Sequence, residues 1–314
     1  MYSRNDQGEY YNSVLLPLEK DVIKRKNTRK IYRQCKRTLK NILKALKARQ
    51  FGKIYHILRS FLKDEYILWK NIKKDTMSVG DIPAQQLYFS DKRVAVYTAV
   101  FGKYDRLQEP RFCPDNVDYF VYTDGGLASE SKWKKKSWEE VMDVSAVTGT
   151  EKNRFLKMFP HLLFPEYEYS VYIDGNIEIR SDFTALALKT EEFPIAMHLH
   201  KDRDCVYEEI DTCIEKRKDT LQALSRQKVI LKNMGIPTHW GLLEAPVIAR
   251  RHHDPVCKKI MEKWWECFMQ GCRRDQIALI RCLWELEIDP AKLGGLGKNV
   301  MENSKFDIKS HMKI

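Results

Sequence analysis

The chain has 314 residues, of which 43% are hydrophobic, and its formal net charge is +12. This length fits one large domain with an appendage, or two domains. No run of about 18 or more apolar residues exists, so the sequence predicts no membrane span. The first 13 residues also lack the charged and apolar regions of a secretory signal.

The positive charge is concentrated at the N-terminus. Residues 1–80 carry 20 Lys and Arg against 7 Asp and Glu, whereas the remaining residues carry 35 against 36. A basic surface for an anionic partner is therefore expected on the N-terminal extension alone. Eight cysteines without a C-x-x-C pair predict free thiols in a reducing compartment.

Residues 19–74 are predicted to be helical, because they contain one glycine, no proline and apolar residues spaced three and four apart. Gly80 and Pro83 indicate a linker over residues 78–86, so we expect a basic helical extension with its linker at 1–85 and a second domain at 86–314. The helical stripe fits an anionic membrane surface. The alternative is a helical hairpin packed on the second domain, and nucleic acid is disfavoured because few aromatics have base-reading spacing.

Strands and helices alternate from residue 93 onward. Strands are expected at 93–102 and 117–124, then a helix at 150–165 with Thr150 as its cap, and a strand ending at Ile173. A strand ending near His198 and His200, a helical segment at 205–233, a strand at 241–250 and helices on both sides of Gly271 follow. This order predicts an α/β fold with a layered sheet.

Polar residues stand where several of these strands end, which is the edge at which ligands bind in open α/β sheets. They include Thr98 with the loop after the first strand, Asp124, the Asp174-Gly175-Asn176 triplet, and the two histidines. The carboxylate of Asp174 needs water, a donor or a cation as its partner. The alternative for Asp174 is a local turn-forming role.

Five segments occur in a fixed order: "VAVYTAVFGKYDRLQEP", "RFLKMFPHLLFPEYEYSVYIDGNIEI", "HLHKDRDCVYEEIDTC", "GLLEAPVIARRHHDP" and "RRDQ". Over residues 92–285 the chain resembles the glycosyltransferase family of the plant rhamnogalacturonan-I galacturonosyltransferases and their bacterial relatives. The resemblance implies a GT-A fold, whose Rossmann-like half binds a nucleotide-sugar. It also implies hexosyl or uronosyl transfer from a cytoplasmic, UDP-linked donor to a glycan or lipid-linked glycan in cell-surface polysaccharide synthesis.

The resemblance also assigns residues to the donor. We expect the donor to contact the following residues: Thr98, Phe101, Gly102, Tyr104, Asp105, Arg154, Lys157, Asp174, Gly175 and Asn176. Most GT-A enzymes hold Mg²⁺ or Mn²⁺ through Asp-x-Asp, but here Asn176 replaces the second acid. We therefore expect that no metal is required and that Arg154 and Lys157 take its place, with Asp174 as the ligand if a metal is used. The alternative is that both cations are solvated surface charges.

Asp275 and Gln276 are expected at the reaction centre, where they orient the acceptor hydroxyl or stabilise oxocarbenium character. The alternative is that they cap the free amides of a helix. A retaining reaction is expected. In an inverting reaction Asp275 or Glu244 would be the base.

His198, His200 and Arg203 are expected to bind the acceptor or a uronate, because arginine binds carboxylates in a bidentate manner. A metal site at the two histidines is the alternative. The rival to the enzyme as a whole is a basic helical adaptor for anionic membrane or nucleic acid, with an inert transferase-like domain.

Overall fold

The computed structural model describes residues 16–59, 61–62, 92–102, 105–139, 141–142, 148–297 and 299–311. The chain divides into two compact units, Met1–Leu87 and Tyr88–Ile314. The predicted boundary between residues 85 and 86 and the predicted linker at 78–86 lie outside the described residues.

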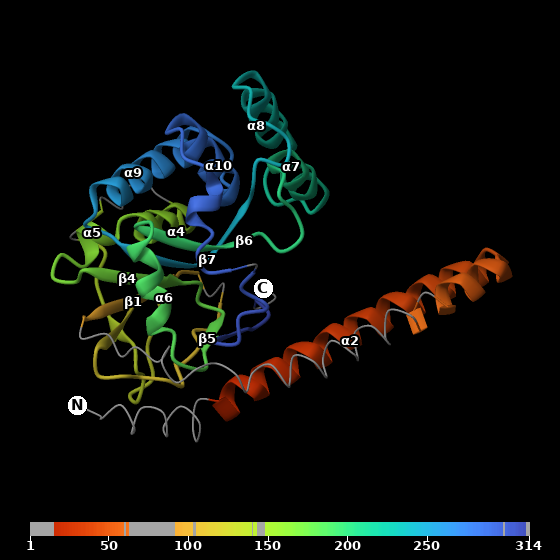
Figure 1. Cartoon of the computed structure of the whole chain (residues 1–314), viewed down its shortest axis with the longest axis horizontal. Coiled ribbons are helices and arrows are strands. Elements are labelled where there is room, and N and C mark those ends of the chain that lie inside the picture. Colours follow the sequence, from red (N-terminus) through yellow and green to blue (C-terminus); the bar gives the residue numbers. More distant parts are fainter. Residues whose placement is uncertain are drawn as a thin grey trace. The chain divides into compact units, whose positions relative to one another are not determined.

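The first unit contains the long helix α2 (Leu16–Lys47), labelled in Figure 1. The chain turns at residues 48–50, where Arg49 has a φ of 52°, and is helical again at 51–59 and 61–62. The predicted continuous helical stretch is therefore interrupted at a position that no glycine or proline marked. Leu39, Leu43 and Leu46 are exposed and lie three and four residues apart, so one face of α2 carries an exposed apolar stripe.

The second unit is built on a six-stranded sheet with the order β3-β2-β1-β4-β7-β6. Its strands are β1 (Val94–Val100), β2 (Val117–Thr123), β3 (Lys134–Lys135), β4 (Tyr169–Ile173), β6 (Ile195–Leu199) and β7 (Leu243–Arg251). The first four strands in this sequence order run parallel, whereas β7 is antiparallel to β4 and to β6. This mixed, mostly parallel sheet confirms the predicted α/β fold class.

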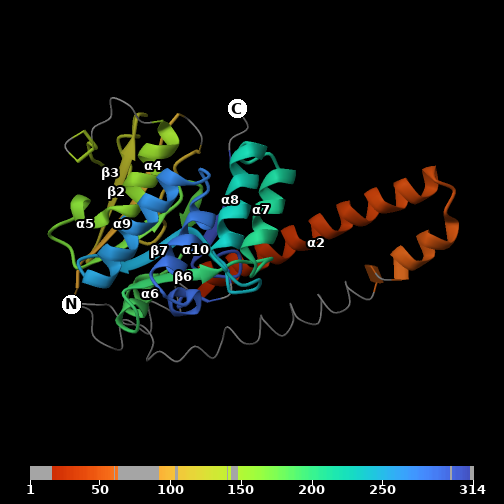
Figure 2. The ribbon, with the colours of Figure 1, turned by 90° about the horizontal axis from the view of Figure 1, so that it is seen from above.

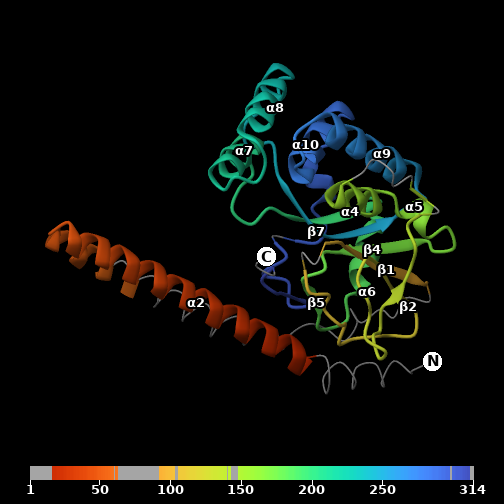
Figure 3. The ribbon, with the colours of Figure 1, turned by 180° about the vertical axis from the view of Figure 1, so that it is seen from behind.

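Helices cover both faces of this sheet. On one face lie α4 (Gly149–Met158), α5 (Pro160–Leu163), α9 (Pro255–Gln270) and α10 (Asp275–Glu285). The short α6 (Thr184–Leu188) contacts β4 and β7 from the other face, as two opposite views show (Figures 1 and 3).

A helical hairpin of α7 (Val206–Glu215) and α8 (Leu221–Asn233) packs beside α10 (Figure 2). A single helical segment was predicted here. It is broken at residues 216–220, because Arg217 adopts a φ of 50° and Thr220 caps the second helix through the amide of Ala223.

The C-terminal segment returns to the sheet edge that carries Asp174. β8 (Phe306–Ile308) pairs antiparallel with β5 (Ile177–Ile179), the strand that follows the Asp174 turn. Two 3₁₀ turns, η4 (Lys189–Glu191) and η5 (Pro290–Leu293), complete the unit. None of the helices in the described part of the chain is long and apolar enough to cross a membrane.

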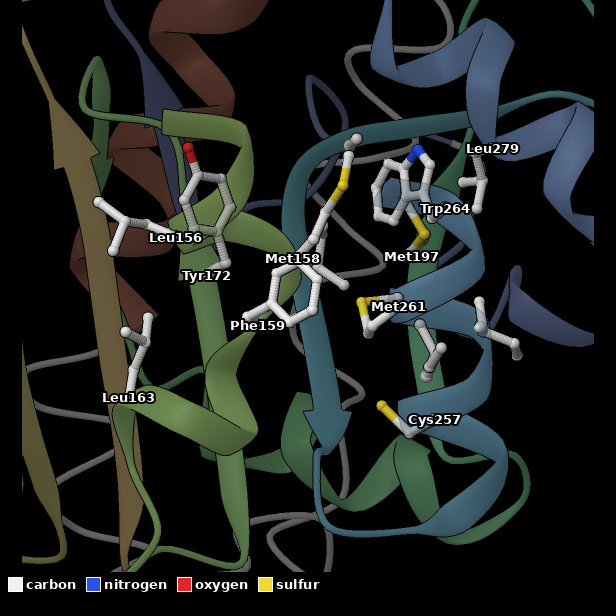
Figure 4. Close-up of a cluster of buried hydrophobic side chains, with 14 of the residues drawn as sticks. Leu156, Met158, Phe159, Leu163, Tyr172, Met197, Cys257, Met261, Trp264 and Leu279 are labelled. Carbon is white, nitrogen blue, oxygen red and sulfur yellow. The ribbon is translucent and has the colours of Figure 1, made fainter. Parts of the chain in front are cut away.

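The main core lies between the sheet and α9, where Met261 and Trp264 are fully buried (Figure 4). The indole Nε1 of Trp264 donates to the backbone carbonyl of Asp275 at 2.8 Å, so the core also fixes the beginning of α10.

Candidate active site

A cleft of about 970 Å³ lies at the edge of the sheet where β1 and β4 end and the antiparallel β7 begins. Its walls come from the loop after β1, the turn after β4, the outward face of α4, the first residues of β7 and α10, the loop between α7 and α8, and the C-terminal segment. The ends of parallel strands thus meet in one cavity, as expected for an α/β ligand site.

Asp174 follows β4 and has both a donor and a cation as partners. Tyr172 donates its hydroxyl to Asp174 Oδ1 at 3.0 Å, and Lys157 Nζ lies 3.8 Å from the same oxygen. One third of the Asp174 side chain remains exposed (33%). The next residue must be small, because a Cβ on Gly175 would lie 2.3 Å from Val100 Cγ2.

Asp275, at the first position of α10, is the centre of a buried ion cluster. Lys157 Nζ lies 2.9 Å and Arg154 Nε 3.0 Å from Asp275 Oδ2. Lys157 is 1% exposed and Asp275 is 4% exposed. Burial by itself would raise the pKa of the Asp275 carboxyl, but the neighbouring cations Arg154, Lys157 and Arg274 outweigh burial and hold it well below its usual value.

The charges of this cluster balance. Arg154 and Lys157 provide two positive charges, and Asp174 and Asp275 provide two negative charges. The structure brings the predicted residues together in the cleft. Lys157 is buried and paired, however, so neither the solvated-charge alternative nor a free cation describes it.

Two buried residues, on the two strands that flank β4, hold Lys157 in place. Its backbone carbonyl accepts from the Tyr97 hydroxyl at 3.0 Å and from Arg250 at 2.6 Å, and its ammonium lies 4.9 Å from the centre of the Tyr172 ring. The N-cap of the helix that carries Lys157 lies two residues earlier than predicted. Thr148, not Thr150, caps α4, in a capping box with Glu151.

Asn176 is tied to the C-terminal segment. Its side-chain Nδ2 donates to the carbonyl of Lys309 at 2.8 Å, and its own carbonyl accepts from the Lys309 amide at 2.9 Å. Among the described residues, no group of three or more His, Cys, Asp or Glu side chains is placed to hold a metal ion. With the Lys157 ammonium already beside Asp174, the residues here do not fit a divalent metal.

Comparison with known proteins assigns the family. The sequence profile of the TOD1/MUCI70, glycosyltransferase-like domain matches residues 68–294, which is more than half of the chain. The chain belongs to this family. No curated protein matches it.

Two solved structures are similar to this chain, each with a TM-score below 0.5. One is the apo structure of the bifunctional glycosyltransferase WbbM, with a TM-score of 0.41, 10% identity and coverage of 68% of this chain and 39% of that chain. The other is apo mouse xyloside xylosyltransferase 1, with a TM-score of 0.36, 12% identity and coverage of 63% and 84%. The chain thus spans about two fifths of the length of WbbM.

The loop after β1 lines the cleft of the TOD1/MUCI70 domain through Phe101, Gly102 and Asp105. The Gly102 amide donates to Asp124 at 3.0 Å, and Asp105 lies 2.7 Å from the His311 ring. The predicted donor residue Tyr104 lies outside the described residues.

Thr98 differs from the sequence interpretation. It lies within β1, two residues before the strand ends, and is fully buried. It is not part of the cleft lining. The predicted strand, 93–102, already included Thr98, and β1 ends at Val100, so the loop at the cleft begins after Thr98.

Gln276 and Glu244 also line the cleft. Gln276 donates through Nε2 to the carbonyl of Leu243 at 3.3 Å. Glu244 accepts from the amides of Lys201 at 3.1 Å and Val300 at 3.3 Å, and burial raises the pKa of its carboxyl. One contact supports the alternative that Asp275 caps the free amides of its helix: the Gln276 amide donates to Asp275 Oδ1 at 3.2 Å.

His198, His200 and Arg203 do not line the cleft. His198 is fully buried, with its Nε2 3.1 Å from Asn303. The Arg203 guanidinium is held by Glu209 at 2.6 and 2.8 Å, and His200 accepts the Arg203 amide. The structure therefore places His200 and Arg203 in a separate polar cluster with Glu209 of α7, and His198 against Asn303.

Sequence reasoning missed two walls of the cleft. Arg273 and Arg274 lie directly before Asp275, and the loop between α7 and α8 contributes Lys218 and Asp219. The Arg273 amide donates to Asp219 at 2.7 Å, which ties the two walls together. The adjacent "RRDQ" motif was a signal for the arginines, whereas the approach of the loop depends on tertiary packing.

Proposed function

We propose that this chain is a glycosyltransferase that moves a sugar from a nucleotide-sugar, UDP-linked, to a glycan acceptor. One observation carries the proposal. In a member of a glycosyltransferase-like family, a buried cluster of Asp174, Asp275, Arg154 and Lys157 opens into a large cleft at the carboxyl edge of the sheet.

The donor lies at the ends of β1, β2 and β4. The Gly102–Asp124 hydrogen bond fixes the loop after β1, and Gly175, which has no Cβ, lets the turn after β4 pack against Val100. Asp174 keeps an exposed oxygen edge that can accept from a sugar hydroxyl. This arrangement supports the expected GT-A manner of donor binding.

Asp275 acts as an anion in this proposal. Its depressed pKa makes it a poor proton acceptor at neutral pH, but a negative carboxylate stabilises positive charge that develops at the anomeric carbon. Gln276 uses its Nε2 on the Leu243 carbonyl, which leaves Oε1 to accept from the acceptor hydroxyl. This favours retention of configuration.

An inverting reaction would need a general base whose pKa is not lowered as that of Asp275 is. Glu244 fits better than Asp275, because burial raises the pKa of Glu244 toward the range in which a carboxylate accepts protons. The two outcomes differ in the anomer formed. No step of either one is assigned to a metal ion, since the residues around Asp174 do not fit one.

The sequence resemblance to the rhamnogalacturonan-I galacturonosyltransferases supports a hexosyl or uronosyl donor and a role in cell-surface polysaccharide synthesis. The exposed stripe on α2 supports attachment of the enzyme to the cytoplasmic side of an anionic membrane, where a lipid-linked glycan would be found. An inert domain on a basic adaptor is the weaker proposal, because burying the charges of Lys157 and Asp275 is costly and would not contribute to adaptor function.

Donor screening tests the proposal. Full-length protein is incubated with UDP-glucose, UDP-galactose, UDP-xylose, UDP-glucuronate and UDP-galacturonate, with and without a mixed polysaccharide acceptor, and released UDP is measured. We expect release from one donor above the rest. Absence of both release and binding for all five would contradict a UDP-sugar donor.

A further inference from the structure

Arg274 differs from the other arginines of the cleft. Arg154 is paired with Asp275, and Arg273 is paired with Glu151 at 3.1 Å and also donates to two backbone carbonyls. Arg274 lines the same cleft, but no carboxylate among the described residues lies within ion-pair distance of its guanidinium. Among the arginines that line the cleft, Arg274 is the one without an ion-paired carboxylate in the described part of the chain.

The surroundings of Arg274 make this unusual. Its Nε is buried without a hydrogen-bond partner in the described part of the chain, and the side chain neighbours the thiol of Cys213, a weak acceptor. A buried guanidinium N–H without an acceptor costs free energy. A ligand that brings an oxyanion would remove that cost on binding.

The net charge of the neighbouring ion cluster also favours Arg274 as the group that binds an anion. Arg154 and Lys157 are balanced by Asp174 and Asp275, so the cluster has no net positive charge to offer a diphosphate. Lys152 and Lys218 also line the cleft, but Lys218 is exposed, and the Lys152 ammonium lies 5.8 Å from the centre of the Trp138 ring. Arg274 directly precedes Asp275 in the chain, and its positive charge helps to lower the pKa of the Asp275 carboxyl.

We propose that Arg274 binds an oxyanion of the substrate (a phosphate of the donor diphosphate or the carboxylate of an acidic sugar). The planar guanidinium can give two parallel N–H···O bonds to either group. In the phosphate case Arg274 offsets the charge that grows on the leaving diphosphate. This inference rests on the proposed function, since it assumes that a nucleotide-sugar occupies the cleft.

The test uses isothermal titration calorimetry of the full-length protein with UDP, UDP-glucose and UDP-glucuronate. The variants are Arg274→Gln, Arg274→Lys and, as a matched control, Arg226→Gln, which removes one exposed arginine of α8 outside the cleft. Loss of a charge-assisted pair of hydrogen bonds weakens binding by about 10- to 100-fold. Circular dichroism checks that each variant is folded.

If Arg274 binds phosphate, Arg274→Gln weakens all three ligands alike. If it binds a sugar carboxylate, only UDP-glucuronate is weakened. In both cases Arg274→Lys restores part of the affinity and Arg226→Gln stays within twofold of the wild type. The inference is overturned if the wild type binds and Arg274→Gln binds all three within twofold. If the wild type binds none of them, the nucleotide-sugar proposal itself fails.

Discussion

Replacing Asp275 by Asn removes the negative centre of the buried cluster. Lys157 Nζ then loses the carboxylate charge at 2.9 Å and keeps the Asp174 carboxylate at 3.8 Å, while Arg154 Nε loses its carboxylate partner at 3.0 Å. Both Lys157 and Asp275 are nearly inaccessible to solvent, so water cannot replace the lost partner. Breaking a buried pair in this way costs about 3 kcal/mol, at the low end of the usual range because Asp174 remains.

For a unit of this size, that loss corresponds to a fall in Tm of about 6–12 °C at pH 7. The matched control is Asp211→Asn, which breaks the exposed pair with Lys228 on the surface of the α7–α8 hairpin. An exposed pair contributes little, so the control should unfold within about 2 °C of the wild type. Differential scanning calorimetry gives both values.

The pH dependence follows from the lowered pKa of Asp275. A carboxyl with a lower pKa in the folded state stabilises fully above its unfolded pKa of about 3.9, and that stability is lost as the pH falls further. The wild type should therefore lose its advantage over Asp275→Asn below about pH 4. Equal Tm values at pH 7, or a gap that grows on acidification, would refute the reasoning.

Three further predictions concern the metal, the turn and the extension. Activity should survive EDTA, because the residues around Asp174 do not fit a divalent ion; loss on chelation and recovery with Mn²⁺ would oppose this. Gly175→Ala should lower donor affinity and Tm together, since its Cβ would lie 2.3 Å from Val100 Cγ2, and an unchanged Tm would mean that the turn relaxes freely. Full-length protein should float with anionic vesicles at low salt and release as salt rises. Leu43→Glu should abolish flotation, whereas Asn41→Glu, which adds the same charge off the apolar stripe, should not; equal behaviour of the two would count against the membrane surface.

The sequence was sufficient for the α/β class because its strands are short, buried and rich in β-branched and aromatic residues. The end of β4 at Asp174 was also recoverable, since Asp-Gly-Asn follows directly on a buried run. The direction of β7 was not recoverable, because a buried strand has the same residue pattern whether it runs parallel or antiparallel to its neighbour β4. The break at Arg49 was missed for a related reason: a positive φ at a non-glycine residue leaves no mark in composition.

The candidate site was recovered in part. Arg154, Lys157 and Asp174 were placed together because the two cations stand one helical turn apart on the helix that directly precedes the strand of Asp174. That Asp275, more than a hundred residues later, pairs with Lys157 could not be read from spacing. The two histidines at the end of β6 show the opposite error, since His198 is buried beside Asn303 and away from the cleft.

UDP release by wild type and Asp174→Asn tests the central claim most directly. The substitution keeps the size of the side chain and an acceptor for the Tyr172 hydroxyl, so the protein should stay folded. With the preferred UDP-sugar and acceptor, the wild type should release UDP, and the folded variant should lose activity by about 100-fold or more, as when a charged group at the reacting centre is removed. Equal UDP release by both proteins would contradict the assignment of this cleft as the site of sugar transfer.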